Sequence, residues 1–348
     1  MNTQSLALTL VTILATIIPT SLLLWLISCS GGGAGSSDPS FAPGSEMQSP
    51  VRWFLAIFLP VYVVMKALSK KSLDLSGGLV ALVIGFVLTL SSYAFTAALL
   101  VFFYSSNRLT RFRASEKRRI DESYRESGQR NWTQVICNGG IACQMSLMYL
   151  LERGSGGEVP INFTLDYSAS WFAVAVLGAI ACSCGDTWAS EVGSVANPSS
   201  DPYLIFSFTR VPRGTNGAVS LAGLAASLAG GSLVGLAFYV TTVICVSRDV
   251  LALSPSQLPL VAVGGIAGLL GSMIDSFLGA NFQFSGQDVV TGRIVEVPGE
   301  RVRWIAGSAL LDNHSVNLIS CLLTSLLTPR IAQAVWSYAD ASAVPFAA

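Results

Sequence analysis

Cys182-Ser183-Cys184-Gly185-Asp186-Thr187-Trp188-Ala189-Ser190-Glu191-Val192-Gly193 closes an apolar run that begins at Ser168. A carboxylate at the edge of hydrocarbon is costly because it loses its hydration, so such a residue is a functional candidate by default. Clusters of acids, hydroxyls, amides and glycines recur three more times, each beside an apolar run. The pattern predicts a protein that crosses a membrane several times and carries one polar site.

The composition agrees with a bilayer environment. Of 348 residues, 52% are hydrophobic and only 11% are charged, against roughly 25% charged in a typical soluble domain. The 20 basic and 20 acidic residues balance, so the charge gives no reason to expect a nucleic-acid partner. The seven cysteines are odd in number and mostly lie within apolar runs, which predicts neither a disulfide framework nor a zinc site.

The apolar runs predict the fold class. A helix needs roughly 20 apolar residues to cross a hydrocarbon core of about 30 Å. Seven runs predict full spans: Ser5–Ser28, Trp53–Ala67, Thr133–Leu151, Ser168–Gly185, Ala218–Val246, Leu258–Ala280 and Trp304–Leu327. Two shorter runs, Leu75–Leu90 and Ser91–Ser105, predict a hairpin of short or re-entrant helices, with one long span as the alternative. We therefore expect an all-α, polytopic membrane helix bundle.

Three regions are expected along the chain. Residues 1–50 hold the first span and a flexible glycine-rich linker, residues 51–328 form the membrane domain with the polar site, and residues 329–348 are a short C-terminal tail. The first apolar run lacks the basic segment of a signal peptide and is long for one, so we expect a retained span.

The basic residues orient the loops, because they collect on the cytoplasmic side of short loops. With the hairpin in place, all but Arg52, Arg153, Arg248 and Arg330 fall on one side. This predicts a cytosolic N-terminus and a polar site that faces the cytosol. We expect the protein in an endomembrane such as the endoplasmic reticulum, although the charges do not identify the organelle. The loop Glu152–Asp166 then faces the lumen or the outside, where the pattern Asn162-Phe163-Thr164 would be reachable for glycosylation.

The loop Asn107–Arg130 is rich in both basic and acidic residues and predicts an amphipathic cytosolic helix. We interpret it as an anchor on anionic lipid headgroups. The alternative is a surface that attracts a phosphorylated ligand.

In the quoted stretch, Asp186 and Ser190 are four residues apart and share a helical face, whereas Glu191 points elsewhere. Carboxylate and hydroxyl oxygens are typical protein contributions to a magnesium site, because the ion keeps water and takes phosphate oxygens for its other ligands. The alternative is a helix-end carboxylate that is satisfied by its neighbours.

The second cluster is a glycine-rich loop, which we expect to lead straight into the helix that starts near Ala218. Such a loop presents backbone N–H groups and a positive dipole end to an anion, and an arginine adds a cation. Its candidate residues are Arg213, Gly214, Thr215, Asn216 and Gly217. A turn followed by a helix cap is the alternative.

The third cluster lies on one glycine-rich helix. Gly268, Ser272, Asp275 and Gly279 fall along one stripe, which predicts close helix packing and an inward carboxylate. Ser276 is a further polar candidate.

The fourth cluster lies in the last apolar run. Asp312 pairs with Ser315, and Asn313 with Asn317, by helical spacing. His314, the only histidine, is more readily a packing residue than a general base. A weaker pair, Gln134 and Asn138, is also four residues apart; it either ties helices together or contacts substrate.

The order of these motifs resembles the transmembrane protein 19 family. The resemblance rests on Gly185–Glu191, Gly214–Gly217, Gly271–Gly279 and Asp312–Asn317, with support from Gln134–Gly139 and Ser69–Gly77, and it extends from about Trp53 to Leu327. The chain departs from the family at His314, where asparagine is usual. The plant branch includes phytyl-phosphate kinase, so the resemblance implies a lipid-phosphate kinase that uses a nucleoside triphosphate.

The leading hypothesis is therefore phosphoryl transfer onto a membrane-embedded isoprenoid or related lipid phosphate. Asp186, Glu191, Asp275 and Asp312 would be catalytic, and Asp186, Asp275 and Asp312 would hold magnesium. Arg213, the Gly214–Gly217 loop and the remaining polar candidates would bind phosphate or substrate, with CTP or ATP as the nucleotide. The alternatives are an ion- or solute-coupled transporter and a non-catalytic membrane scaffold.

Overall fold

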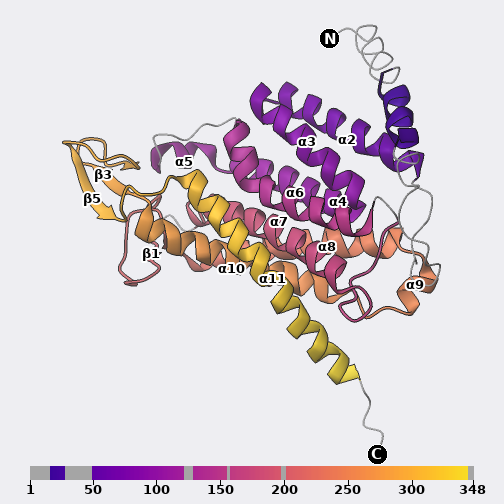
Figure 1. Ribbon diagram of the computed structural model, residues 1–348. Helices are drawn as coiled ribbons and strands as arrows, with labels where there is room; N and C mark the ends of the chain where they lie inside the picture. Colours follow the sequence, from indigo (N-terminus) through magenta and orange to yellow (C-terminus); the bar gives the residue numbers. More distant parts are fainter. Residues whose placement is uncertain (1–15, 28–48, 121–127, 155–156, 197–200, 344–348) are drawn as a thin grey trace, which may run out of the picture.

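The computed structural model (Figure 1) describes residues 16–27, 49–120, 128–154, 157–196 and 201–343. The helices are α2 (Pro50–Ser69), α3 (Leu75–Ser91), α4 (Tyr93–Thr110), α5 (Ala114–Ile120), α6 (Trp132–Arg153), α7 (Tyr167–Gly193), α8 (Leu221–Cys245), α9 (Arg248–Ala252), α10 (Pro259–Phe282) and α11 (Asn313–Ala343). The strands are β1 (Tyr203–Leu204), β2 (Ala218–Val219), β3 (Ser285–Asp288), β4 (Ile294–Val295) and β5 (Val302–Ala306). The predicted helical membrane bundle is confirmed.

Six of the described helices are long and apolar enough to cross a membrane: α2, α6, α7, α8, α10 and the Asn313–Tyr338 part of α11. The predicted first span lies partly outside the described residues, and its described part, Thr16–Ile27, is a shorter apolar helix. The predicted start of the last span at Trp304 is wrong. Trp304 lies on β5, Gly307 turns the chain with φ of 72°, and α11 begins only at Asn313.

The run Leu75–Ser105 forms two helices, as the hairpin prediction required. Ser92 has extended backbone and caps α4 by accepting from the Ala94 N–H at 3.1 Å. The two outer ends meet at Arg130, whose carbonyl accepts from the Asp74 N–H at 3.0 Å and whose guanidinium donates to Asn107. The chain therefore leaves one end of the bundle along α3 and returns to it along α4.

Helix α7 is the centre of the bundle, and 83% of the residues in its most apolar 18-residue stretch are buried. It contacts α6, α8, α10 and α11. Glycines let the helix backbones meet: a Cβ on Gly185 of α7 would lie 2.5 Å from the Gly268 carbonyl oxygen of α10, and one on Gly271 would lie 2.5 Å from the Cys182 sulfur. The predicted close packing of the glycine stripe is confirmed, and it turns Asp275 toward α7 and α11.

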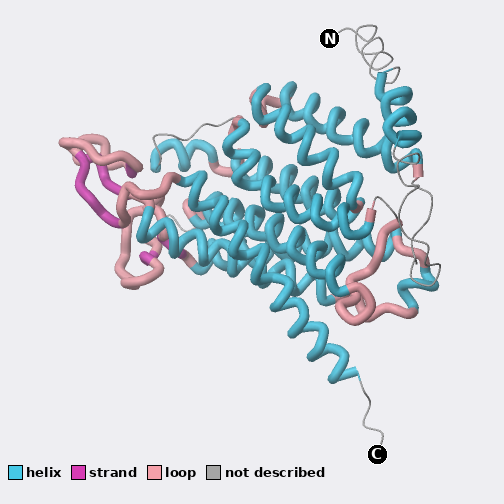
Figure 2. Tube along the Cα trace, viewed as in Figure 1, coloured by secondary structure: helices cyan, strands magenta, loops and turns pink. Residues whose placement is uncertain are grey.

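The strands gather at one end of the bundle, beside α5 (Figure 2). β3 is the centre of a three-stranded antiparallel sheet of order β4-β3-β5, and β1 pairs with β2. This end also holds the start of α6 and the last turn of α7, and we call it the cavity end. The sequence analysis did not predict these strands.

The opposite end is formed by the start of α2, the α3–α4 break and residues 157–166, and we call it the Glu158 end. Arg52 and Glu158 form a buried ion pair at 2.8 Å, and Arg153 pairs with Asp166 at 2.7 Å. Arg52 and Arg153, two of the four basic residues that do not fall on the predicted cytosolic side, are thus neutralised by acids. Asn162 is only 7% exposed, and its side-chain oxygen accepts from the N–H groups of Thr164 and Leu165. The structure therefore contradicts the expectation of an accessible glycosylation site.

Candidate polar cavity

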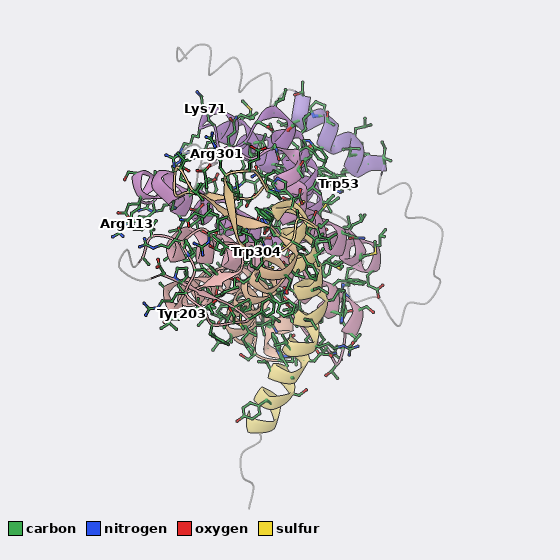
Figure 3. All side chains as sticks on the ribbon, turned by 90° about the vertical axis from the view of Figure 1, so that its left-hand side faces the viewer. Trp53, Lys71, Arg113, Tyr203, Arg301 and Trp304 are labelled. Atoms are coloured by element: carbon green, nitrogen blue, oxygen red, sulfur yellow. The ribbon has the colours of Figure 1, made fainter. Side chains whose placement is uncertain are left out.

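A polar cavity of about 670 Å³ lies at the cavity end, between α6, α7, α8, α10, α11 and the loop before β2. Figure 3 looks onto this end, where Lys71, Arg113 and Arg301 add cationic side chains and Tyr203 and Trp304 add aromatic ones. The predicted site residues that line the cavity are Gln134, Asn138, Asp186, Ser190, Glu191, Arg213, Gly214, Thr215, Asn216, Gly217, Asp275, Ser276, Asn313 and Asn317. Residues from the four sequence clusters and from the weaker pair on α6 therefore share one space.

Asp186 lies on the wall contributed by α7 and is half-buried. It follows the fully packed segment of α7, where Gly185 meets the α10 backbone, so the chain has little freedom to move the carboxylate away. Within the described part of the chain, no group donates a hydrogen bond to this carboxylate. Asp186 is thus a charge at the end of an apolar helix that faces the cavity without a neutralising partner.

Asp275 lies on α10 and is oriented by α11. The Ser320 hydroxyl donates to Asp275 Oδ2 at 3.1 Å. The Asn317 amide, with its nitrogen turned toward the acceptors, donates to the same oxygen at 3.1 Å and to the Asn313 carbonyl at 3.1 Å. Asp275 and Asp186 line the same cavity. The two carboxylates from α7 and α10 therefore belong to one acidic centre.

Glu191 also lines the cavity but is neutralised by Lys117 of α5, and the side chains of this pair are 17% and 5% exposed. Lys117 also donates to the Leu109 carbonyl at 2.8 Å, and Arg113 donates to the Val195 carbonyl at 2.7 Å. Two cations of the charged loop therefore bind protein rather than lipid headgroups. The described helix in this loop, α5, is shorter than predicted, and residues 121–127 lie outside the described part.

The glycine-rich loop lines the cavity, but it does not lead straight into the next helix as predicted. Strand β2 stands between it and α8, which Ser220 caps by accepting from the Gly223 N–H at 3.1 Å. Gly217 has φ of 76° and lies against Ala280, so no side chain would fit there. The Thr215 N–H donates to the Pro212 carbonyl and the Asn216 N–H to the Ser285 hydroxyl. Two of the four expected amide donors are thus engaged within the protein.

The structure places Asp312 outside the cavity lining. It caps α11 by accepting from the Ser315 N–H at 2.8 Å, and its hydrogen bonds with Ser315 lower the pKa of this exposed carboxyl. Among the described residues, no three His, Cys, Asp or Glu side chains group closely enough to hold a metal ion. The predicted trio Asp186, Asp275 and Asp312 is therefore reduced to the first two. His314 does not line the cavity either.

Gln134 and Asn138 use part of their hydrogen-bonding capacity within α6. Gln134 and Asn131 form a capping box, and the Asn138 amide donates to the Gln134 carbonyl at 2.9 Å. Neither side chain bonds to another helix through these contacts, although both face the cavity. The arrangement favours the substrate-contact alternative over the helix-tying one.

Sequence reasoning missed Arg130 and Asp74 as site residues. Both line the cavity, and Arg130 joins Arg213 as a cation of that lining. Asp74 caps α3 by accepting from the Gly77 N–H and the Ser76 hydroxyl, each at 2.7 Å, and these bonds lower its pKa. The capping sequences themselves, Asp74-Leu75-Ser76-Gly77 and Arg130-Asn131, were signals that polar groups mark these helix starts.

The sequence pattern of the family described as integral membrane protein DUF92 matches residues 58–325. Protein PGR of Arabidopsis thaliana is 39% identical over 81% of this chain and 97% of its own. An uncharacterized membrane protein of Methanocaldococcus jannaschii is 22% identical over 81% of this chain and 94% of its own. The chloroplastic Protein VTE6 of Arabidopsis thaliana is 26% identical over 77% of this chain and 68% of its own. No solved structure matches.

These matches agree with the resemblance that the motifs indicated. The match covers most of the membrane bundle, including α6, α7, α8, α10 and the start of α11, from which the cavity is built. The chain is a multi-pass membrane protein, and it belongs to the DUF92 family of integral membrane proteins.

Proposed function

We propose that the protein is a phosphotransferase that moves a phosphoryl group from a nucleoside triphosphate to an isoprenoid or related lipid monophosphate at the membrane. The observation that carries the proposal is the polar cavity, which combines the unpaired Asp186 and the oriented Asp275 with Arg130 and Arg213 at one end of an apolar bundle. The topology predicted from the basic residues would place this cavity on the cytosolic side, where nucleotide is available.

The composition of the cavity suits phosphoryl transfer. This reaction requires little covalent chemistry from the protein and depends on positioning and on stabilising charge. Arginine recognises phosphate through several N–H donors at once, and Arg130 and Arg213 both line the cavity from separate loops. In this proposal the lipid phosphate and the nucleotide would share this cavity, which lies between the helices of the bundle and the loop before β2.

The proposed reaction is balanced without a general base. An oxygen of the lipid monophosphate attacks the γ-phosphorus of the nucleotide, a new P–O bond forms, and the bond from the γ-phosphorus to the β–γ bridging oxygen breaks. The nucleoside diphosphate leaves with the electron pair, and the lipid becomes a diphosphate. Because a phosphate monoester is largely ionised at neutral pH, with its second pKa near about 6, its oxygen needs no deprotonation. The position of His314 outside the cavity lining is compatible with this chemistry.

Magnesium and CTP or ATP are the cofactor and donor that this chemistry requires. Magnesium is usually held by one or two carboxylates together with water and substrate phosphates, and Asp186 and Asp275 are a donor set of that kind. When bound, the ion would neutralise phosphate charge. Asn317 and Ser320 would keep Asp275 oriented, and Glu191 would stay paired with Lys117 as a support for the cavity wall.

The lipid acceptor is proposed from the family. The resemblance to the transmembrane protein 19 family implies a kinase of this type, because its plant branch includes phytyl-phosphate kinase. The matching relatives include a chloroplastic plant protein and an archaeal membrane protein. A cavity at the membrane surface supports an amphiphilic acceptor, whose phosphate and chain have different environments.

The test is a transfer assay on the purified full chain in detergent. The protein is incubated with magnesium, with γ-labelled CTP or ATP, and with phytyl or farnesyl phosphate. We expect a labelled lipid diphosphate from the wild type and loss of that product in Asp186→Asn. Absence of product across the whole panel, with folded protein, overturns the proposal. Solute flux in proteoliposomes that depends on Asp275, without transfer, would support the transporter alternative instead.

A further inference from the structure

A second, smaller pocket of about 130 Å³ lies between α2, α3, α4 and α6. Its wall is mainly apolar and includes Leu59 and Val63 of α2, Ala81 and Ile84 of α3, and Leu99 and Phe103 of α4. Two hydroxyls of the wall are bonded within the protein, since Thr96 donates to Thr89 at 3.0 Å and Thr89 donates to the Gly85 carbonyl at 2.7 Å. A third, the buried Ser106 hydroxyl, has no hydrogen-bond partner among the described residues. The pocket is therefore mainly a hydrocarbon site with one unsatisfied hydroxyl in its wall.

The apolar pocket adjoins the polar cavity. Arg130, Gln134, Asn138 and Thr187 line both spaces. Three of these residues come from the start of α6 and its preceding loop, and the fourth comes from α7 one position after Asp186. A ligand that fills both spaces would thus have its charged group beside Arg130 and its apolar part between α3 and α4.

The size of the apolar pocket limits what it holds. An apolar cavity of about 150 Å³ stays dry and accommodates benzene, so a pocket of about 130 Å³ accepts roughly one five- or six-carbon unit. A longer chain must continue beyond the pocket, between helices that are themselves apolar. The pocket is large enough to recognise the branched unit next to a phosphate, but not a complete isoprenoid tail.

From this juxtaposition we propose that the pocket between α2, α3, α4 and α6 binds the first hydrocarbon unit of the lipid phosphate, next to its headgroup. This inference rests on the proposed function for the identity of the ligand, and it adds where the acceptor chain lies and which part of it is selected. The occupant is the chain of a prenyl-type phosphate, with Arg130 at the junction as the group that positions its phosphate.

The experiment is photo-crosslinking to the full chain in detergent, with a farnesyl phosphate that carries a diazirine on the unit nearest the phosphate. We expect labelled peptides from α3, α4 or the start of α6, and we expect excess unlabelled geranylgeranyl phosphate to suppress the labelling. The matching diazirine farnesol, which lacks the phosphate, should label these peptides at least about tenfold less, because it forfeits charge-assisted contacts to Arg130.

Two substitutions on α3 provide a matched pair. Ala81 lines the pocket, whereas Val83 is 61% exposed on the outer face of the same helix. Ala81→Phe should reduce labelling about tenfold or more, since a misfit of even one methylene in an apolar pocket costs that much. Val83→Phe should leave labelling unchanged. If Ala81→Phe does not fold, the peptide map of the wild type still decides.

Labelling confined to outward-facing residues, or labelling insensitive to competitor, overturns the inference. Equal labelling by the phosphate and the alcohol overturns it as well, because the pocket would then bind hydrocarbon without reference to the polar cavity. The experiment measures binding and not turnover. A protein that labels as expected but transfers no phosphoryl group would contradict the proposed function alone, and a protein that transfers but labels elsewhere would contradict this inference alone.

Discussion

Carboxylates at the two ends of the bundle have opposite surroundings. At the Glu158 end, the carboxylate accepts from the Arg52 guanidinium at 2.8 Å, the Ser92 hydroxyl at 2.6 Å and the Tyr93 N–H at 2.8 Å. At the cavity end, no described group donates to the Asp186 carboxylate. A buried charge that is fully paired has a structural role, whereas one that faces a cavity unpaired is a candidate for chemistry.

The structural role of the first group is visible in its partners. Arg52 also donates to the Ser91 carbonyl at 3.1 Å, so the pair joins the start of α2, the α3–α4 break and the loop before α7. The break at Ser92 leaves backbone groups that α3 and α4 cannot satisfy themselves. Arg52 and Glu158 supply those bonds. This structural role explains why Arg52 lies at the end opposite to most of the basic residues.

The largest expected effect is on stability at the Glu158 end. Glu158→Gln should lower the free energy of unfolding by about 3–5 kcal/mol, because it leaves Arg52 buried without a counter-charge. The measurement is denaturant-induced unfolding in mixed micelles, with the exposed Glu152→Gln as the control. An Arg52→Met/Glu158→Gln double variant should lose less than the two single variants together. Equal losses for Glu158→Gln and Glu152→Gln would show that the pair is not structural.

At the cavity end, Asp186→Asn should lower activity rather than stability. Phosphoryl transfer should fall by about 10²-fold or more, the usual cost of losing one preorganised electrostatic group, while unfolding should be unchanged or slightly less favourable. The comparison requires both kinetics and unfolding measured on the same preparation, with the exposed Asp201→Asn as the control. A loss of stability as large as that of Glu158→Gln would assign Asp186 to structure.

A smaller effect is expected at Lys117, where the two kinds of charge meet. Lys117→Met leaves Glu191 without its partner at the cavity wall, and it should lower stability by about 2 kcal/mol. Hydrogen exchange of α5 amides should accelerate at least about tenfold if this contact holds α5 in place. Lys70→Met, at an exposed lysine, is the control. Unchanged exchange in α5 would show that the remaining contacts, such as Arg113 to Val195, suffice.

The smallest effect is expected at Asp312. Asp312→Ala should cost at most about 1 kcal/mol, as for an exposed helix cap, and should leave transfer within about twofold. Because its pKa in the folded protein is lowered, its contribution is present above the unfolded value of about 3.9 and is lost as the pH falls. Unfolding measured between pH 7 and pH 3 checks the sign. A large loss of phosphoryl transfer would show that Asp312 is a functional residue of the site.

The predictions from sequence were confirmed for most of the helices that are long and apolar enough to cross a membrane. The spans around Trp53, Thr133, Ser168 and Leu258 are present within a few residues, because a backbone in lipid must form helices and the apolar runs have the length of a crossing. The hairpin at Leu75–Ser105 was predicted from the balance of basic residues. The last span was placed too early because Trp304 and Ile305 are apolar, although they belong to β5 of the three-stranded sheet.

The acidic residues were recognisable as candidates, but their partners were not. Asp186, Asp275, Glu191 and Asp312 have similar sequence surroundings, each a carboxylate beside an apolar run. Helical spacing alone does not tell which of them faces a cation from another element. Lys117 neutralises Glu191 from a distance of 74 residues along the chain, and Arg130 enters the cavity from a loop that had been read only for its charge.

By itself the sequence determined a membrane helix bundle and a set of polar groups too costly to be incidental, because transfer of charge and backbone into hydrocarbon is penalised locally, residue by residue. Only the tertiary structure decided that Asp186 and Asp275 share a cavity, that Glu191 is paired, and that Asp312 caps a helix outside the cavity. Those outcomes depend on which side chains meet across α5, α7, α10 and α11, and contacts between distant segments are set by packing rather than by local pattern.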